Sequence, residues 1–372
     1  MSSRNPLASI ALLATTLVVA LAAFGALGAS AAPAPAPQGF VGITSQDTFN
    51  GGEAYRAKMF SEMQASGITL IRVEFTWAQI ETAPDVFNFS AYDQFVLDAA
   101  QHGIEVMPVL YEEPGWYTSR PKKVKPTSVE YLNYPPASPS DITNFVTALV
   151  KQYGPGGTLW QENPTVTPVP IRVWQVWDEP NLNFFWYPHA SAKAYTALLA
   201  AASQAIHAVD PGAEVVSAGM PQSLDGINLD KFVRELVADG AGKWMNTLAV
   251  NAYSSTASGV IGILKGVRSI LNAGGDSGVA LRVSEIGWSD VGPKSAFRAG
   301  VKGQATQISS VINDFGANRS SLNLKGFVYF TWRDTKPFYK VKDFWGLHTG
   351  LLRLNGTAKP SLQAFTNAVA GL

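Results

Sequence analysis

The sequence predicts a single (β/α)8 barrel at residues 40–372, preceded by a signal peptide at residues 1–31 and a Pro/Ala linker at residues 32–39. Eight short apolar segments alternate with helical segments, which is the pattern of repeated strand–helix units around a parallel sheet. Each predicted strand is a continuous apolar run, as expected of strands that are buried on both faces. The connections are short enough for right-handed crossovers, and no sequence repeat or second domain interrupts the series.

The predicted elements follow one another in a regular order. The strands lie at residues 40–44, 68–75, 104–110, 171–178, 213–218, 247–253, 279–285 and 326–332. The helices lie at residues 52–66, 92–100, 141–153, 190–209, 231–238, 259–272, 294–315 and 359–369, and Asp141 or Ser140 is the expected N-cap of the third. Residues 112–139, rich in Pro, Tyr and Lys, form a long loop on the carboxyl side of the third strand. Residues 154–170 form a structural loop on the opposite rim.

The N-terminus has the features of an export signal. Arg4 gives a positive start, residues 7–27 are almost wholly apolar, and residues 29–31 (Ala-Ser-Ala) match the small-residue cleavage pattern. We therefore expect a secreted protein with no stable membrane association after cleavage. The alternative is an uncleaved membrane anchor, because the apolar run is long enough to span a bilayer.

The composition excludes several classes of function. The 372 residues include 28 basic and 28 acidic side chains, so no excess charge attracts nucleic acid or an anionic membrane. The absence of Cys excludes disulfides, thiol nucleophiles and thiolate zinc sites, and no two of the four His have metal-ligand spacing. We expect neither a metal nor a cofactor. The ten Trp, twelve Tyr and nineteen Phe suit stacking on sugar rings, and nothing in the charge pattern indicates an oligomeric state.

The segment from Ile171 to Trp186, IRVWQVWDEPNLNFFW, carries the first candidate site. Pro180 ends the strand, so Asp178 and Glu179 are presented at its carboxyl end. Trp174, Trp177 and Trp186 are expected to wall this acidic pair, and apolar surroundings raise a carboxyl pKa enough for proton donation near neutral pH. The alternative is a pair of acidic residues at the positive end of a helix.

A second carboxylate, Glu285, ends the seventh strand in the sequence LRVSEIGW. The fourth and seventh strands are three apart on an eight-strand ring, so Glu179 and Glu285 can face each other across the barrel mouth. Two facing carboxyl groups can cleave a glycosidic bond, one as proton donor and the other as nucleophile. The alternative for Glu285 is a salt bridge to Arg72, which would also keep a nucleophile ionised.

These motifs resemble those of a known group of enzymes. WQVWDEPN and VSEIGW are similar to the paired signatures of clan A glycoside hydrolases. WDEPNLNFFW and RVEFTWAQIE resemble family 39 and its bacterial relatives more than family 5. The resemblance implies a retaining mechanism in which Glu179 is the general acid/base and Glu285 the nucleophile.

The resemblance also implies roles for other residues. Arg72 would lie beside the nucleophile, Tyr253 would hydrogen-bond to it, and Trp332 would form the floor under the sugar. Walls of neighbouring subsites would come from Trp77, Trp116 and Trp186, although Trp also fills barrel cores.

Two positions depart from the clan pattern. Asp178 replaces the Asn that usually contacts the 2-hydroxyl of the sugar, and its charge would raise the pKa of Glu179. Asn251 replaces a His on the sixth strand and can still form hydrogen bonds with the substrate. Neither change removes a group that the two-step mechanism needs.

The sequence therefore predicts a secreted retaining glycosidase with a carbohydrate substrate. One alternative is a carbohydrate-binding barrel whose active site has decayed, with Asp178 as the sign of decay. Another is a metal-dependent hydrolase or deacetylase, which the scattered His residues argue against. The identity of the sugar, and internal against terminal cleavage, stay open, because the 112–139 loop could build either a cleft wall or a lid.

Overall fold

The computed structural model describes residues 35–126, 128, 131–337 and 342–372. The predicted signal peptide and the first part of the predicted linker lie outside the described residues. No helix in the described ranges is both long enough and apolar enough to cross a bilayer.

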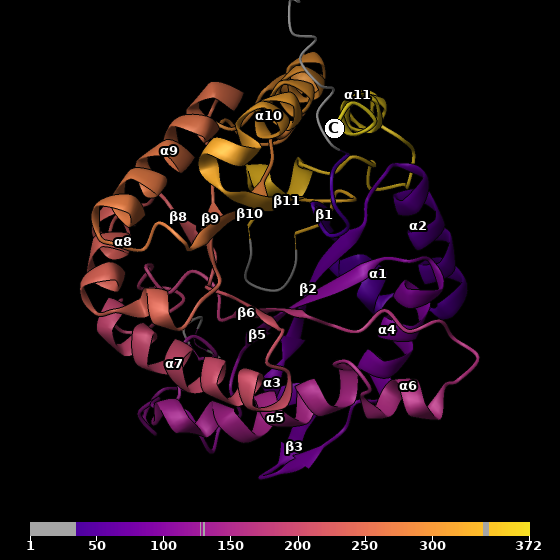
Figure 1. Cartoon of the computed structure of the whole chain (residues 1–372). Helices are drawn as coiled ribbons and strands as arrows, with labels where there is room; N and C mark the ends of the chain where they lie inside the picture. Colours follow the sequence, from indigo (N-terminus) through magenta and orange to yellow (C-terminus); the bar gives the residue numbers. More distant parts are fainter. Residues whose placement is uncertain (1–34, 127, 129–130, 338–341) are drawn as a thin grey trace, which may run out of the picture. The chain divides into compact units, whose positions relative to one another are not determined.

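Eight parallel strands close into a barrel, which confirms the predicted fold class. Seven neighbouring pairs run in the order β10-β11-β1-β2-β5-β6-β7-β9, and an additional pairing of β10 with β9 closes the ring. Figure 1 shows these strands at the centre, surrounded by helices. The barrel strands are β1 (Val41–Thr44), β2 (Leu70–Thr76), β5 (Glu105–Tyr111), β6 (Val173–Val176), β7 (Glu214–Val216), β9 (Thr247–Asn251), β10 (Ala280–Ile286) and β11 (Leu324–Tyr329).

Eight helices cover the outside of the barrel, each close to a predicted helical segment. They are α2 (Glu53–Ala65), α4 (Ser90–Gln101), α5 (Ile142–Tyr153), α7 (Ala192–Val209), α8 (Leu229–Ala238), α9 (Ala257–Ala273), α10 (Gly300–Leu322) and α11 (Pro360–Val369). Their apolar faces pack on the strands and form one continuous core.

Short elements that the sequence did not predict lie between these units. They are α1 (Gln46–Asn50), α3 (Trp77–Ile80), the hairpin of β3 (Glu81–Ala83) and β4 (Val86–Phe87), α6 (Thr158–Glu162), β8 (Met220–Pro221) and the 3₁₀ turns Pro139–Asp141, Ala241–Lys243 and Trp345–His348. The prediction that residues 154–170 form only a loop is wrong. Trp160 of α6 is buried and its indole N–H donates to the Tyr153 carbonyl, so α6 closes part of the core.

One predicted helix start is also wrong. The α10 helix begins at Gly300, not at residue 294, because the preceding residues pair with Ser289: the Ser289 N–H donates to Phe297 and Ala299 donates back to Ser289. Asp141 is the N-cap residue of α5, as predicted, but its side chain makes no capping bond to that helix. Its carboxylate accepts instead from the Ser138 N–H, in a capping box on the 3₁₀ turn that leads into α5.

The interior of the barrel changes from apolar to polar along β2. Leu70 forms a small buried cluster with Met107 and Val328. Gly42 lies against this cluster, and a Cβ there would meet the Val328 side chain at 2.9 Å, so only Gly fits. Because alternate residues of a strand share a face, Arg72 lies one step above Leu70 and Glu74 one step above Arg72. The polar layer therefore lies at the carboxyl ends of the strands.

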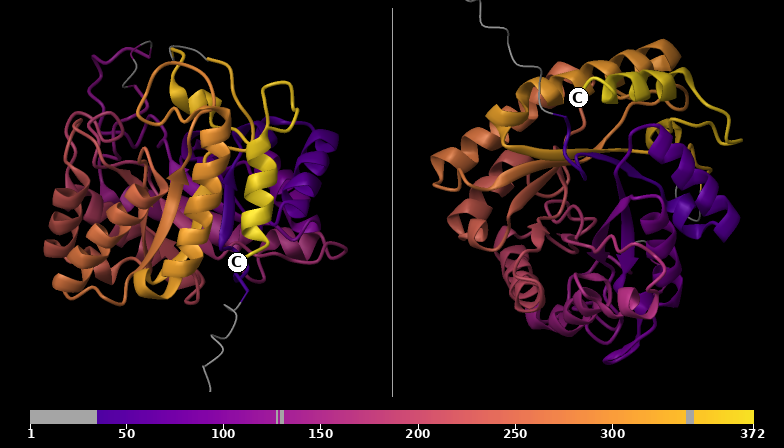
Figure 2. Two further views of the ribbon diagram at one scale, coloured as in Figure 1. Left: turned by 90° about the horizontal axis from the view of Figure 1, so that it is seen from above. Right: turned by 45° about the vertical axis from the view of Figure 1, so that its right-hand side comes forward.

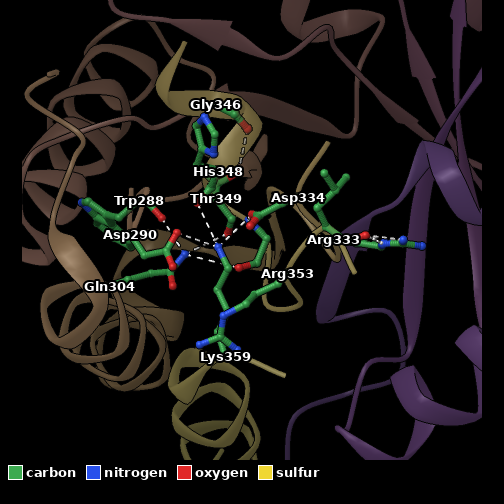
Figure 3. Close-up of polar contacts among 12 residues, drawn as sticks. Trp288, Asp290, Gln304, Arg333, Asp334, Gly346, His348, Thr349, Arg353 and Lys359 are labelled. Carbon is green, nitrogen blue, oxygen red and sulfur yellow. Dashed lines mark hydrogen bonds and ion pairs between the residues drawn. The ribbon is translucent and has the colours of Figure 1, made fainter. Parts of the chain in front are cut away.

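The long loops gather at the carboxyl ends of the strands, while the C-terminus lies at the other end of the barrel (Figure 2). A buried lysine anchors the last loops. Lys359, before α11, is 1% exposed and donates to Asp290 at 2.7 Å, to Asp334 at 2.8 Å and to the His348 carbonyl at 3.2 Å (Figure 3). This cluster ties the segments after β10 and β11 to the start of the final helix.

Candidate active site

Arg72 forms the floor of the candidate site. Its side chain is almost fully buried, and each of its three nitrogen atoms donates to a different side chain, two from the β6 segment and one from β10. Nη1 donates to Glu285 Oε1 at 2.6 Å, Nη2 to Asp178 Oδ1 at 2.8 Å and Nε to Gln175 Oε1 at 2.9 Å. Burial alone would lower the pKa of Arg72, but the two carboxylates outweigh it and the pKa is raised. The guanidinium thus joins the ends of β6 and β10 across the barrel.

Glu285 is held at both carboxylate oxygens. Arg72 contacts Oε1, and the Tyr253 hydroxyl donates to Oε2 at 2.7 Å. A register shift between β10 and β9, at Val283/Glu285, interrupts the strict alternation of side chains there. Two hydrogen bonds from a cation and a phenol favour the ionised form and fix the direction of the carboxylate, as a nucleophile requires.

Glu179 lies in a different environment. Its backbone is in the left-handed region at φ 39°, and its N–H donates to the Gly219 carbonyl at 3.1 Å. The Asn251 amide donates to Oε1 at 2.7 Å. Burial raises the pKa of Glu179 well above its ordinary value, and the charges of Asp178 and Glu285 raise it further. Glu179 is therefore the carboxyl group of this pair that retains a proton near neutral pH.

Asp178 shares Arg72 with Glu285. Its Oδ1 accepts from Arg72 and, at 3.3 Å, from Gln175. Burial raises the pKa of Asp178 to about 7, while Arg72 acts in the opposite direction. As the pH rises, Asp178 thus ionises before its neighbour Glu179, and its charge then helps to keep the Glu179 proton in place.

Further carboxyl groups stand beside this site on β2 and after β5. Glu74 is exposed at the mouth. Burial raises the pKa of Glu112 to about 7 and that of Glu113 to about 8, and Glu113 Oε2 is buried with no hydrogen-bond partner among the described residues. Glu112 at φ 58° and Trp177 at φ 70°, like Glu179, hold left-handed backbone conformations. Such conformations cost about 1–3 kcal/mol each and cluster at functional sites.

Most of the tryptophans that the sequence assigned to sugar contacts are buried in the structure, and their contact with a sugar stays a prediction. Trp77 is 1% exposed, with its indole against Glu81 and its ring stacked on Phe145. Trp186 is 4% exposed and packs edge-on against Trp177.

Of the other tryptophans expected near the sugar, three are buried and one is exposed. Trp332 is 0% exposed, and its indole N–H points to the Met59 sulfur, so neither face is free to form the floor under a sugar. Trp174 and Trp177 are fully buried in the core. Trp116, after β5, is 46% exposed and keeps a free surface.

Three residues near the carboxyl pair were missed by the sequence reasoning. Gln175 binds Arg72 and Asp178, Ser284 donates to Asn251 at 2.7 Å, and Gly219 contacts Glu179 through its carbonyl. The position of Gln175, one residue before the end of β6, was a signal that could have been used. The other two depend on the register of neighbouring strands.

A separate hollow of about 700 Å³ lies beside the Lys359 cluster, and Figure 3 shows several of the residues around it. Its lining residues follow β10 and β11, and none of them is among the site residues described above. Within the described ranges, no group of three or more His, Asp or Glu side chains is arranged to hold a metal ion.

Comparisons with solved structures show a barrel fold shared with known proteins. No protein-family model matches the chain, and no curated protein matches it in sequence. A family 39 glycoside hydrolase from Bacteroides cellulosilyticus WH2 is 17% identical, with a TM-score of 0.61 over 90% of this chain and 64% of that one. The GH39 enzyme from Xanthomonas axonopodis pv. citri is 18% identical, with a TM-score of 0.65 over 91% and 68%. A glucosidase from Croceicoccus marinus is 14% identical, with a TM-score of 0.66 over 91% and 68%.

At these identities the likeness establishes a shared barrel fold. Two of these neighbours belong to the family that the sequence motifs resemble. The chain spans 64% of the length of the first neighbour and 68% of the other two.

Proposed function

We propose that this protein is a secreted retaining glycoside hydrolase in which Glu179 is the general acid/base and Glu285 the nucleophile. The observation that carries the proposal is the contrast between the two carboxyl groups. Glu285 accepts hydrogen bonds from Arg72 and Tyr253, which favour its ionised form, while burial keeps the proton on Glu179. Such a pair at the carboxyl end of a (β/α)8 barrel is suited to double displacement at a sugar.

In the first step, Glu179 transfers its proton to the glycosidic oxygen as the bond from that oxygen to the anomeric carbon breaks. One oxygen of Glu285 forms a bond to the anomeric carbon, giving a glycosyl ester and releasing the protonated leaving group. Arg72 and Tyr253 hold the Glu285 carboxylate in place during the attack.

In the second step, the ionised Glu179 accepts a proton from water. The water oxygen attacks the anomeric carbon, and the bond to Glu285 breaks, which restores both carboxyl groups to their starting states. Two inversions at the same carbon retain the anomeric configuration. The carbohydrate substrate itself is supported by the names of the structural neighbours, which are a family 39 hydrolase, a second family 39 enzyme and a glucosidase.

The proposal can be tested with purified residues 32–372 and a panel of plant and bacterial polysaccharides, with products followed by chromatography. We expect oligosaccharide or monosaccharide release that Glu179→Gln and Glu285→Gln each reduce by at least 10³-fold. Proton NMR of the first product should show the anomeric configuration of the substrate. Unchanged activity in either variant would exclude the assignment of that residue.

The same panel distinguishes a hydrolase from a carbohydrate-binding barrel without activity. Binding of a glycan without any release, from polymers and from activated aryl glycosides alike, would identify a carbohydrate-binding barrel instead. Secretion is tested separately, by expressing the full chain with a C-terminal tag and sequencing the N-terminus of the protein recovered from the medium.

A further inference from the structure

A chain of three side chains ends at the proposed acid. The Ser284 hydroxyl donates to Asn251 Oδ1 at 2.7 Å, and Asn251 Nδ2 donates to Glu179 Oε1 at 2.7 Å. Ser284 and Asn251 are 0% and 1% exposed, so water does not compete for these bonds. The pairing of β9 with β10 uses backbone groups, so it requires neither the Ser284 hydroxyl nor these side-chain hydrogen bonds.

The local backbone explains how Ser284 reaches this position. In a regular strand, two consecutive side chains point to opposite faces. Here the register shift between β9 and β10 at Val283/Glu285 interrupts the alternation, so that Ser284 contacts Asn251 while Glu285 contacts Arg72. Ser284 and Glu285 therefore both contact residues of the candidate site, although they are consecutive in the strand.

Gly219 keeps the space that the chain of bonds needs. A Cβ on Gly219 would lie 2.3 Å from Asn251 Oδ1 and 2.4 Å from Ser284 Oγ. Its carbonyl accepts the backbone N–H of Glu179 at 3.1 Å. The backbone of Gly219 thus confines both the Asn251–Ser284 contact and the Glu179 main chain.

The direction of each bond follows from the donors available. Asn251 Oδ1 can only accept, so the serine hydroxyl must donate to it. This leaves Nδ2 directed at Glu179, and a carboxyl oxygen that accepts an N–H bond is the unprotonated oxygen of a neutral acid. The proton of Glu179 is then carried by Oε2.

We propose that Ser284 is a positioning residue that orients the Asn251 amide and thereby places the catalytic proton of Glu179 on Oε2. The proposal rests on the proposed function, in which that proton goes to the glycosidic oxygen. Without the serine hydroxyl, the amide can rotate and present Oδ1 to Glu179, which would draw the proton to Oε1 and away from the leaving group.

The test compares Ser284→Ala with wild type on two aryl glycosides of the sugar identified by the panel. One has a poor leaving group (4-methylphenol), which needs proton donation, and the other an activated one (2,4-dinitrophenol), which does not. General acid catalysis contributes typically 10²–10⁴-fold. We expect Ser284→Ala to reduce kcat/KM at least about tenfold with the poor leaving group and less than about threefold with the activated one. Equal losses on both substrates, or no loss, would overturn the proposal.

A second measurement does not depend on turnover. Carbon-13 NMR of labelled glutamate can follow the titration of Glu179, which is assigned by its absence in Glu179→Gln. The charged and titratable groups that act on Glu179 are Asp178, Glu285, Arg72 and Tyr253, and all are unchanged in Ser284→Ala. Because the Asn251 bond lowers the pKa of Glu179, its loss should raise that pKa by about one unit.

Ser203→Ala is the matched control. Ser203 is 2% exposed on α7 and its hydroxyl bonds only to His207 Nδ1, at 3.3 Å, so the same atom is removed from an unrelated buried site. An unchanged Glu179 titration in Ser284→Ala, or an equal shift in Ser203→Ala, would overturn the proposal. If the wild type cleaves no glycan yet the titration shifts as expected, the proposed function fails while the positioning of Glu179 by Ser284 stands.

Discussion

Replacing Asp178 by Asn should move the alkaline limb of the activity profile to lower pH. Asp178 precedes Glu179 and adds a negative charge beside it when ionised. Asn keeps an oxygen that can accept from Arg72 and Gln175, so the floor of the site is preserved while the charge is removed. The variant therefore isolates the electrostatic effect of Asp178 on the acid.

The size of the effect follows from Coulomb's law. Two unit charges roughly 6 Å apart in a medium with an effective dielectric constant of about 20 interact by about 3 kcal/mol, or about 2 pKa units. Arg72 lies 2.8 Å from Asp178 and neutralises part of this charge. About one pKa unit remains.

The sign follows from the role of the proton. Glu179 must be protonated at the start of the reaction, so activity falls as the pH rises through its pKa. In wild type, Asp178 ionises near pH 7 and delays the loss of the Glu179 proton. In Asp178→Asn this delay is absent, so kcat/KM should decline at a pH lower by about one unit.

The assay is kcat/KM from pH 4 to 10 on a single substrate from the panel, because this ratio reports the free enzyme. Asp230→Asn, an exposed position at the start of α8, is the control for the same chemical change. An alkaline limb that stays in place, or moves to higher pH, would refute the argument that Asp178 raises the pKa of Glu179.

Three further predictions concern the support of the site. Tyr253→Phe keeps the ring but removes the hydroxyl that donates to Glu285, so kcat/KM should fall about 10–100-fold with little change in the urea midpoint of unfolding. Trp116→Ala removes an exposed ring after β5, so KM for long oligosaccharides should rise about fivefold while KM for short ones stays constant in steady-state assays. Lys359→Met leaves two buried carboxylates without their cation, so urea denaturation should show a loss of about 3–5 kcal/mol; a loss below 1 kcal/mol would contradict the anchoring role of this cluster.

The barrel could be predicted from sequence because its signals are local. Each barrel strand is a short apolar run between turn residues and overlaps its predicted segment, as Ala280–Ile286 overlaps residues 279–285. The errors occur where a distant contact decides the local conformation. The backbone pairing of Ser289 with Phe297 delays the start of α10, and the burial of Trp160 converts part of a loop into a helix.

The site residues likewise fall into those that the sequence could predict and those that depend on distant contacts. Arg72 lies inside β2 and Tyr253 just after β9, and the structure brings both within hydrogen-bond distance of Glu285. Ser284 could not be predicted, because its inward position depends on a register shift that a sequence pattern does not record. The exposure of the tryptophans could not be predicted either, because a Trp beside a strand end can face the mouth or the core, and Trp77 and Trp186 are buried.

The arrangement around Arg72 favours a catalytic interpretation of Glu285 over a structural ion pair. Burying a guanidinium with two carboxylates carries a desolvation cost of several kcal/mol per ion, and apolar residues of similar size are often as stabilising or more so. The same barrel uses that apolar solution one layer below, where Leu70 and its two neighbours fill the interior. A second buried guanidinium, that of Arg282, lies 3.6 Å from Glu214 outside the site, so a buried ion pair is not by itself a sign of catalysis in this barrel. The Glu285 pair differs in that the same carboxylate also accepts a hydrogen bond from Tyr253, and a cation and a phenol together stabilise the negative charge that a nucleophile carries.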